Sequence, residues 1–168
     1  MNCLLWLLAG ALALPAHAQQ SGPVKLARKR LAAPKPPASL AAAEPVLVVK
    51  RTPCHGTCPT YTAAIYADGR VEYEGERFVA LLGKHTLRLP AATVNQMLAE
   101  AKRINFSKLQ DQYVGNTADL PATIITVHPM GQPAKTVQAQ EDIPASLEDY
   151  ALFLTQQLDP LAKGVMDR

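Results

Sequence analysis

Residues 52–61, which read Thr-Pro-Cys-His-Gly-Thr-Cys-Pro-Thr-Tyr, carry the strongest constraint on the fold. They contain Cys54 and Cys58, the two cysteines that lie outside the N-terminal apolar segment, and they separate two runs typical of strands. Two prolines fix their own φ angles and one glycine allows conformations closed to other residues. The pattern predicts a tight connection, and a bond between the two sulfurs would make it a covalent staple at the start of the fold.

The first 18 residues have the features of a cleaved export signal. Their apolar run ends in an Ala-His-Ala small-x-small site, so cleavage is expected between Ala18 and Gln19. This run is shorter than the roughly 20 residues that cross a membrane. We therefore expect an exported protein, periplasmic or extracellular, with the signal peptide removed.

Residues 19–45 are predicted to form a disordered linker rich in Ala, Pro and Lys. They carry five basic residues and one acidic residue, whereas residues 46–168 carry 12 basic and 13 acidic residues. Such a linker associates at most weakly with anionic lipid or cell-wall polymers, and a passive tether is the simpler interpretation. Because the domain has no predicted basic face and export is expected, no nucleic-acid partner is expected.

Runs of β-branched or alternating apolar residues predict strands. An Asp-Gly pair at 68–69 is a strong hairpin signal between two of these runs. In the next run, Val71 and Tyr73 alternate with three charged residues, which is typical of a sheet with one face toward solvent. We expect strands at 46–49, 61–66, 70–74, 78–82 and 86–89, with a turn at 83–84, and further strands at 122–128 and 134–139.

Two amphipathic patterns predict helices. After Pro90, apolar residues recur at spacings of three and four over residues 94–104, and residues 106–113 are expected to add a short second helix. A further helix begins at Pro144, continues with the same spacing and is expected to stop at 159–160.

The order of these elements predicts an α+β fold. We expect a single domain over residues 46–160, with an antiparallel sheet of about five to seven strands and two main helices packed on one face. The expected element order is β-β-β-β-β-α-β-β-α, and residues 161–168 are expected to form a C-terminal tail.

The cysteine pair allows three interpretations. A structural disulfide is preferred in an oxidising compartment, although so small a loop gains at most a couple of kcal/mol in the chain-entropy treatment. A redox-active dithiol is a second interpretation, with a spacing one residue longer than Cys-x-x-Cys. A copper or zinc site formed by Cys54, His55 and Cys58 is the third, and it would need a fourth ligand such as His85 or His128.

Other chemistry is sparsely represented. The sequence contains no Gly-rich phosphate loop, no Gly-x-Ser-x-Gly and no His-Glu-x-x-His motif. We therefore expect no catalytic residues and no cofactor. His55, Tyr61 and Asp119 are the candidate contacts to a ligand or partner, and the simplest role for Asp119 is that of a turn or capping acceptor.

Several segments resemble one family. Residues 51–61 and 66–75, together with Tyr113, residues 119–121 and the helical pattern at 144–159, are similar to the exported bacterial family called domain of unknown function 6438. The resemblance covers most of residues 46–160. It implies a small envelope domain with a paired-cysteine loop, and it implies no activity. In this family an apolar or aromatic residue is expected where His55 stands, which disfavours a general metal role.

We therefore expect a non-enzymatic exported binding or accessory domain whose partner is an envelope protein or peptide. A sheet edge or an exposed sheet face suits an extended peptide. The alternative is a thiol-disulfide redox protein or a copper- or zinc-handling protein that uses Cys54, His55 and Cys58.

Overall fold

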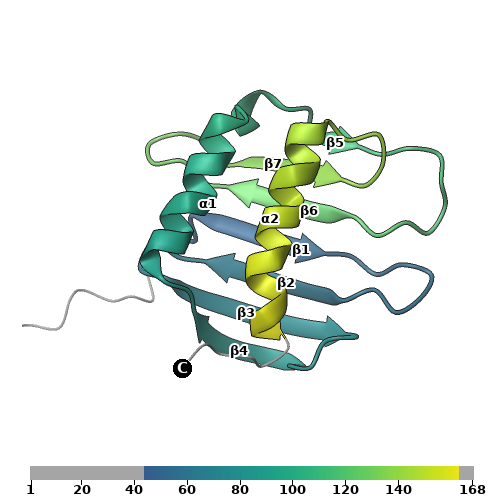
Figure 1. Cartoon of the computed structure of the whole chain (residues 1–168), viewed down its shortest axis with the longest axis horizontal. Coiled ribbons are helices and arrows are strands. Elements are labelled where there is room, and N and C mark those ends of the chain that lie inside the picture. Colours follow the sequence, from purple (N-terminus) through teal and green to yellow (C-terminus); the bar gives the residue numbers. More distant parts are fainter. Residues whose placement is uncertain (1–43, 163–168) are drawn as a thin grey trace, which may run out of the picture. The chain divides into compact units, whose positions relative to one another are not determined.

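The computed structural model describes residues 44–162 (Figure 1). The predicted signal segment with its cleavage site, the linker up to residue 43 and residues 163–168 lie outside the described residues. Among the described helices, none has the length and apolar character that a membrane span requires. The elements are, in chain order, β1 (Leu47–Arg51), β2 (Thr60–Ile65), β3 (Arg70–Arg77), β4 (Gly83–Arg88), α1 (Ala91–Arg103), η2 (Phe106–Lys108), β5 (Gln112–Tyr113), β6 (Thr123–Val127), β7 (Lys135–Ala139) and α2 (Ala145–Ala162).

The described strands form one seven-stranded sheet in the order β4-β3-β2-β1-β6-β7-β5. β1 lies at its centre because Val49 pairs antiparallel with Ala63 of β2 on one side and with Ile125 of β6 on the other. The sheet is antiparallel except at one edge, where β5 pairs with β7 in parallel. The sequence predicts an antiparallel sheet, and the β5–β7 pair is the exception. β7 lies between β6 and β5 and is antiparallel to β6, and β5 runs opposite to β6, so β5 and β7 run in the same direction.

Alternation along the strands gives the sheet a buried face, and both helices lie across that face (Figure 1). Fully buried strand residues such as Leu47 and Ile65 share one core with Met97 of α1 and Leu154 of α2. Each such side chain stabilises the fold by about 2 kcal/mol through removal from water. The predicted α+β fold with two helices on one face of a sheet is confirmed.

The segment at residues 78–82 is a turn and not the predicted strand. β3 continues to Arg77 and β4 begins at Gly83, which pairs with Gly75, so four strands and not five precede α1 in the described chain. The turn folds back over Gly75, whose lack of a side chain leaves room for the Leu81 carbonyl group. The Leu81 amide then donates to the Ala162 carbonyl oxygen at 3.1 Å, and this contact fixes the turn beside the end of α2.

The helical segments also differ in length from the prediction. α2 continues through Pro160 to Ala162 because Leu161 and Ala162 are buried in the core, and this burial offsets the hydrogen bond that proline cannot donate. Residues 106–113 hold only one short 3-10 turn, η2, and Tyr113 belongs to β5.

Replacing Gly75 by alanine is expected to lower the free energy of unfolding by about 2–3 kcal/mol, because the new Cβ would overlap the Leu81 carbonyl oxygen and lie 2.8 Å from Val79 Cγ2. Urea denaturation followed by circular dichroism measures the change. The control is Gly131→Ala, where the described residues leave open space and only the φ of +69° costs about 1 kcal/mol. A loss no larger than in the control would contradict this position of the 78–82 turn.

Candidate functional site

The disulfide loop (residues 52–59) connects β1 to β2, and a disulfide joins Cys54 to Cys58 with their Cα atoms 5.8 Å apart. The predicted pairing of the two sulfurs is therefore present in the structure. The Gly56 amide donates to the Cys54 carbonyl oxygen at 2.9 Å, which closes a tight turn inside the bridge. In this form neither sulfur is a thiolate that could bind a metal ion.

The disulfide loop is held against the loop that precedes β6. The His55 amide donates to the Asp119 carbonyl oxygen at 3.3 Å. The Thr52 amide donates to the Ala122 carbonyl oxygen at 3.0 Å, and the Ala122 amide donates to Thr52 Oγ1 at 2.7 Å. The structure thus brings His55 and Asp119 together through their backbones, and the side chain of His55 is exposed.

Glu141 holds the loop that precedes β6 at Thr117. Its carboxylate accepts hydrogen bonds from the Thr117 hydroxyl and, at 3.1 Å, from the Thr117 amide. These two bonds, the hydroxyl bond first, lower the pKa of the Glu141 carboxyl. Hydrogen bonds therefore hold both loops at this end of the sheet, and the disulfide closes the first of them.

Tyr61 lies in the core and holds α2 to the sheet. Its hydroxyl donates to Asp159 Oδ1 at 3.0 Å, and Arg51 Nη1 lies 3.6 Å from Asp159 Oδ2. Burial, followed by the charge of Asp159, raises the pKa of the Tyr61 hydroxyl far above its usual range. Asp159 lies in the last turn of α2, where the helix dipole disfavours a negative charge, so Arg51 offsets that cost.

Tyr73 packs beside Tyr61 with ring centroids 5.4 Å apart. Its hydroxyl is buried and has no hydrogen-bond partner among the described residues. Burial, together with the nearby charge of Asp159, raises the pKa of Tyr73 to about 12. The two buried tyrosines therefore differ in whether the hydroxyl has a hydrogen-bond partner among the described residues.

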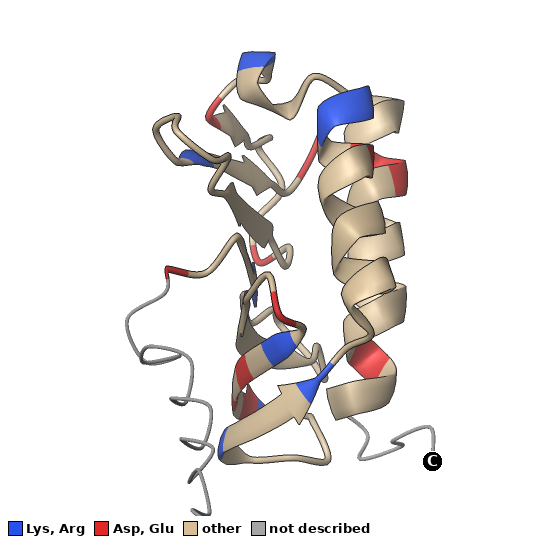
Figure 2. Cartoon of the chain, turned by 90° about the vertical axis from the view of Figure 1, so that its left-hand side faces the viewer, with Lys and Arg blue, Asp and Glu red and all other residues tan. Residues whose placement is uncertain are grey.

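The other face of the sheet, which we call the outer face, is not covered by a described helix (Figure 2). Strand register places its side chains in rows across the sheet. In one row Thr86, Glu72, Ala64 and Val48 are successive neighbours on β4, β3, β2 and β1. In the next row the successive neighbours are Lys84, Glu74, Thr62 and Lys50.

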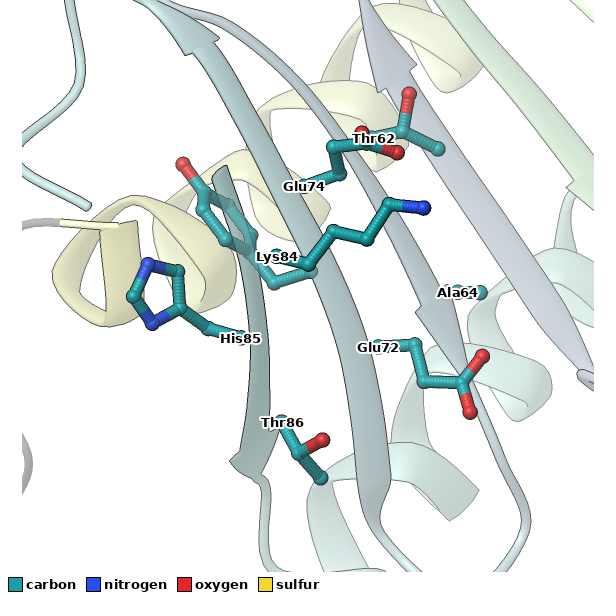
Figure 3. A pocket seen from close by; sticks show the side chains of 8 residues that line it. Thr62, Ala64, Glu72, Glu74, Lys84, His85 and Thr86 are labelled. Carbon is teal, nitrogen blue, oxygen red and sulfur yellow. The ribbon is translucent and has the colours of Figure 1, made fainter. Parts of the chain in front are cut away.

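A shallow hollow of about 420 Å³ lies on the outer face over β2, β3 and β4 (Figure 3). Ala64 has the smallest side chain of the residues that line the hollow. It therefore forms the floor, and longer side chains from the neighbouring strands form the walls. The side chains of Thr62, Ala64, Glu72, Glu74, Lys84 and Thr86 line the hollow from the outer face. Tyr73 and His85 also border it, but they alternate with these residues along β3 and β4, so their side chains belong to the opposite face of the sheet.

The charged groups of this hollow differ in how firmly they are held. Glu72 accepts a hydrogen bond from the Tyr66 hydroxyl at 2.8 Å and forms an ion pair with Arg70, whose guanidinium lies 3.5 Å from the Tyr66 ring centroid. The bond to Glu72 is the main cause that raises the pKa of Tyr66. Glu74 and Lys84 face each other across β3 and β4, and the ion pairs of the described residues use neither of them. These two exposed charges are therefore available to a ligand.

A second hollow, of about 520 Å³, lies over β5, β6 and β7. Lys135 and Asp111 form an ion pair at its rim. The floor contains Ile124, Thr136 and Gln138, which alternate with the buried residues of the same strands. The outer face thus has two open depressions on either side of β1.

Placement of the described His, Cys, Asp and Glu side chains provides no group of three or more that could hold a metal ion. The ring of His85 lies beside that of Tyr73, with centroids 6.5 Å apart, and its Nε2 lies 2.9 Å from the Leu82 carbonyl oxygen. The structure does not bring His85 and the disulfide loop into any common metal-ligating group among these residues.

These features define a class of protein: a small α+β domain with one face sealed by helices, one open face and a disulfide-closed loop at one end of the sheet. The chain belongs to the family described as Domain of unknown function (DUF6438), whose family model matches residues 45–158. No curated protein and no solved structure matches the chain significantly.

Tyr61 and Tyr73 provide a matched test of the core cluster. Tyr61→Phe is expected to lower the free energy of unfolding by about 1.5–3 kcal/mol, because it removes a hydrogen bond to a charged acceptor. Tyr73→Phe is expected to be neutral or stabilising, because it removes a buried hydroxyl that has no described partner. Urea denaturation at pH 7 measures both, and equal losses in the two variants would count against this arrangement.

The disulfide is expected to be structural. Replacing both Cys54 and Cys58 by serine should lower the free energy of unfolding by about 2 kcal/mol, the value expected from loop entropy for so short a loop. The reduction potential, measured by equilibration with thiol buffers, should lie below about −300 mV. A potential near that of disulfide isomerases, about −180 mV, would instead support the redox alternative.

Proposed function

We propose that this protein is an exported, non-enzymatic binding or accessory domain that holds an extended peptide segment of an envelope partner on its outer face. The observation that carries the proposal is the contrast between the two faces. One is buried beneath α1 and α2, and the other is uncovered by described helices and has two open hollows. The outer-face side chains do not form the core, so they can contact a peptide without loss of the fold.

The shape of the hollows supports a long ligand. Sites for small molecules are concave and bury most of the ligand. Here the depressions are shallow and lie side by side on one sheet, with Val48 and Lys50 of β1 between them. An extended peptide that crosses the strands would contact both, and its own charges would pair with Glu74 and Lys84.

Rigidity supports the same proposal. The outer-face rows are set by strand register, and the loops at one end are held by the disulfide and by hydrogen bonds to the backbone of Asp119 and Ala122. A preordered surface loses little conformational entropy when a ligand binds. Export is part of the proposal and rests on the apolar run and cleavage site of residues 1–18.

Site-specific photo-crosslinking in cells tests the proposal. A photoreactive amino acid at Thr62 or Thr136, on the outer face, is expected to give one discrete crosslinked protein in the envelope fraction. The same amino acid at Leu152, which is exposed on α2, is the control and should give none. Adding Ala64→Arg, which fills the first hollow, should reduce the Thr62 crosslink about tenfold. Crosslinks that are equal at Leu152 and Thr62 would refute the outer face as the binding surface.

A further inference from the structure

The 78–82 turn exposes apolar side chains that the core does not use. Phe78 is 50% exposed and Leu82 is 62% exposed. The turn reads Phe-Val-Ala-Leu-Leu, and the six residues between Arg77 and Lys84 carry no charge. In a chain of which 18% of the residues are charged, this is an apolar tip with a basic residue at each end.

The backbone at Phe78 makes this residue unexpected on grounds of stability. Its φ is +55°, a left-handed conformation that costs an L-residue with a side chain about 1–2 kcal/mol and that glycine or asparagine adopts more readily. The ring is half exposed, and the Arg77 guanidinium lies 5.3 Å from its centroid. Neither burial nor backbone preference therefore favours a phenylalanine here, and the exposed contact with Arg77, worth about 0.5–1 kcal/mol, offsets only part of the backbone cost.

We propose that the 78–82 turn is a contact site for an anionic lipid surface. Phe78 and Leu82 enter the boundary between head groups and acyl chains, where apolar and aromatic side chains are favoured. Arg77 and Lys84 remain at the head groups, where each basic residue adds about 1 kcal/mol of attraction. A lipid surface fits better than a charged protein partner because the tip itself offers no charge for a partner to pair with.

The turn by itself binds weakly. Two apolar side chains give only marginal membrane affinity, and the neighbouring Glu76 opposes an anionic surface. The five basic residues of segment 19–45 supply a second, electrostatic attraction on the same chain. Two weak contacts on one chain reinforce each other, because the first raises the effective concentration of the second. This inference rests on the proposed export. It shares only Lys84 with the outer face, and the variants that test it leave Lys84 unchanged.

Co-sedimentation with vesicles tests the proposal. The probe is a vesicle of phosphatidylglycerol and phosphatidylcholine in equal amounts. The protein is the chain from Gln19 to Arg168, the form that the predicted signal cleavage would leave. The double variant Phe78→Asn/Leu82→Asn is expected to bind about tenfold more weakly while its thermal midpoint is unchanged or higher. The control Leu152→Asn removes an equally exposed apolar side chain from α2 and is expected to bind as the parent does.

Four results would overturn the proposal. The first is that the parent chain does not bind the vesicles. The second is that the double variant binds as tightly as the parent, which would assign all binding to the basic segment. An equal loss in Leu152→Asn would show that any exposed apolar side chain is sufficient. Self-association that the double variant abolishes, in the absence of vesicle binding, would make the turn an interface between copies of the chain. None of these results bears on the crosslinking test of the outer face.

Discussion

The double pairing of β1 is the constraint on which the structure depends. β1 joins the β2–β4 meander on one side to β6, β7 and β5 on the other, and its Leu47 and Val49 side chains are fully buried. Without it, neither half would have a continuous face for both helices to cover. The disulfide loop follows β1 immediately, and Thr52 extends the contact with the β6 side by two hydrogen bonds to Ala122.

The division into a sealed face and an open face follows from this arrangement. Successive side chains of a strand point to opposite faces, so the register that buries Val49 and Ala63 also places Val48 and Ala64 in the outer rows. Tyr61, Asp159 and Arg51 then hold the end of α2 over the buried face. The core therefore uses one side of the sheet and leaves the other side, where we propose that the peptide binds, without a covering helix in the described chain.

Local patterns predicted the parts of this fold that depend on local physics. The hairpin at 68–69 and the apolar stripe of α1 follow from turn chemistry and periodicity. The disulfide is preferred over a redox dithiol and a metal site because an oxidising compartment is expected, and the structure contains the bond. The 78–82 turn could not be predicted, because its apolar composition is that of a strand and its shape depends on the room left at Gly75. The Tyr61–Asp159 bond joins residues 98 positions apart, and the outer hollows depend on cross-strand register, so neither has a local signal.

Hydroxyl-radical footprinting of the purified chain tests the central claim, that one face of the sheet is sealed and the other is open to a ligand. Ile124 and Ile125 are adjacent in β6, have the same side chain and point to opposite faces, so they form an internal comparison. The account predicts oxidation of Ile124, which is partly exposed, and protection of Ile125, which is fully buried. Equal protection of both would show that the outer face is covered in the protein itself and would contradict the account.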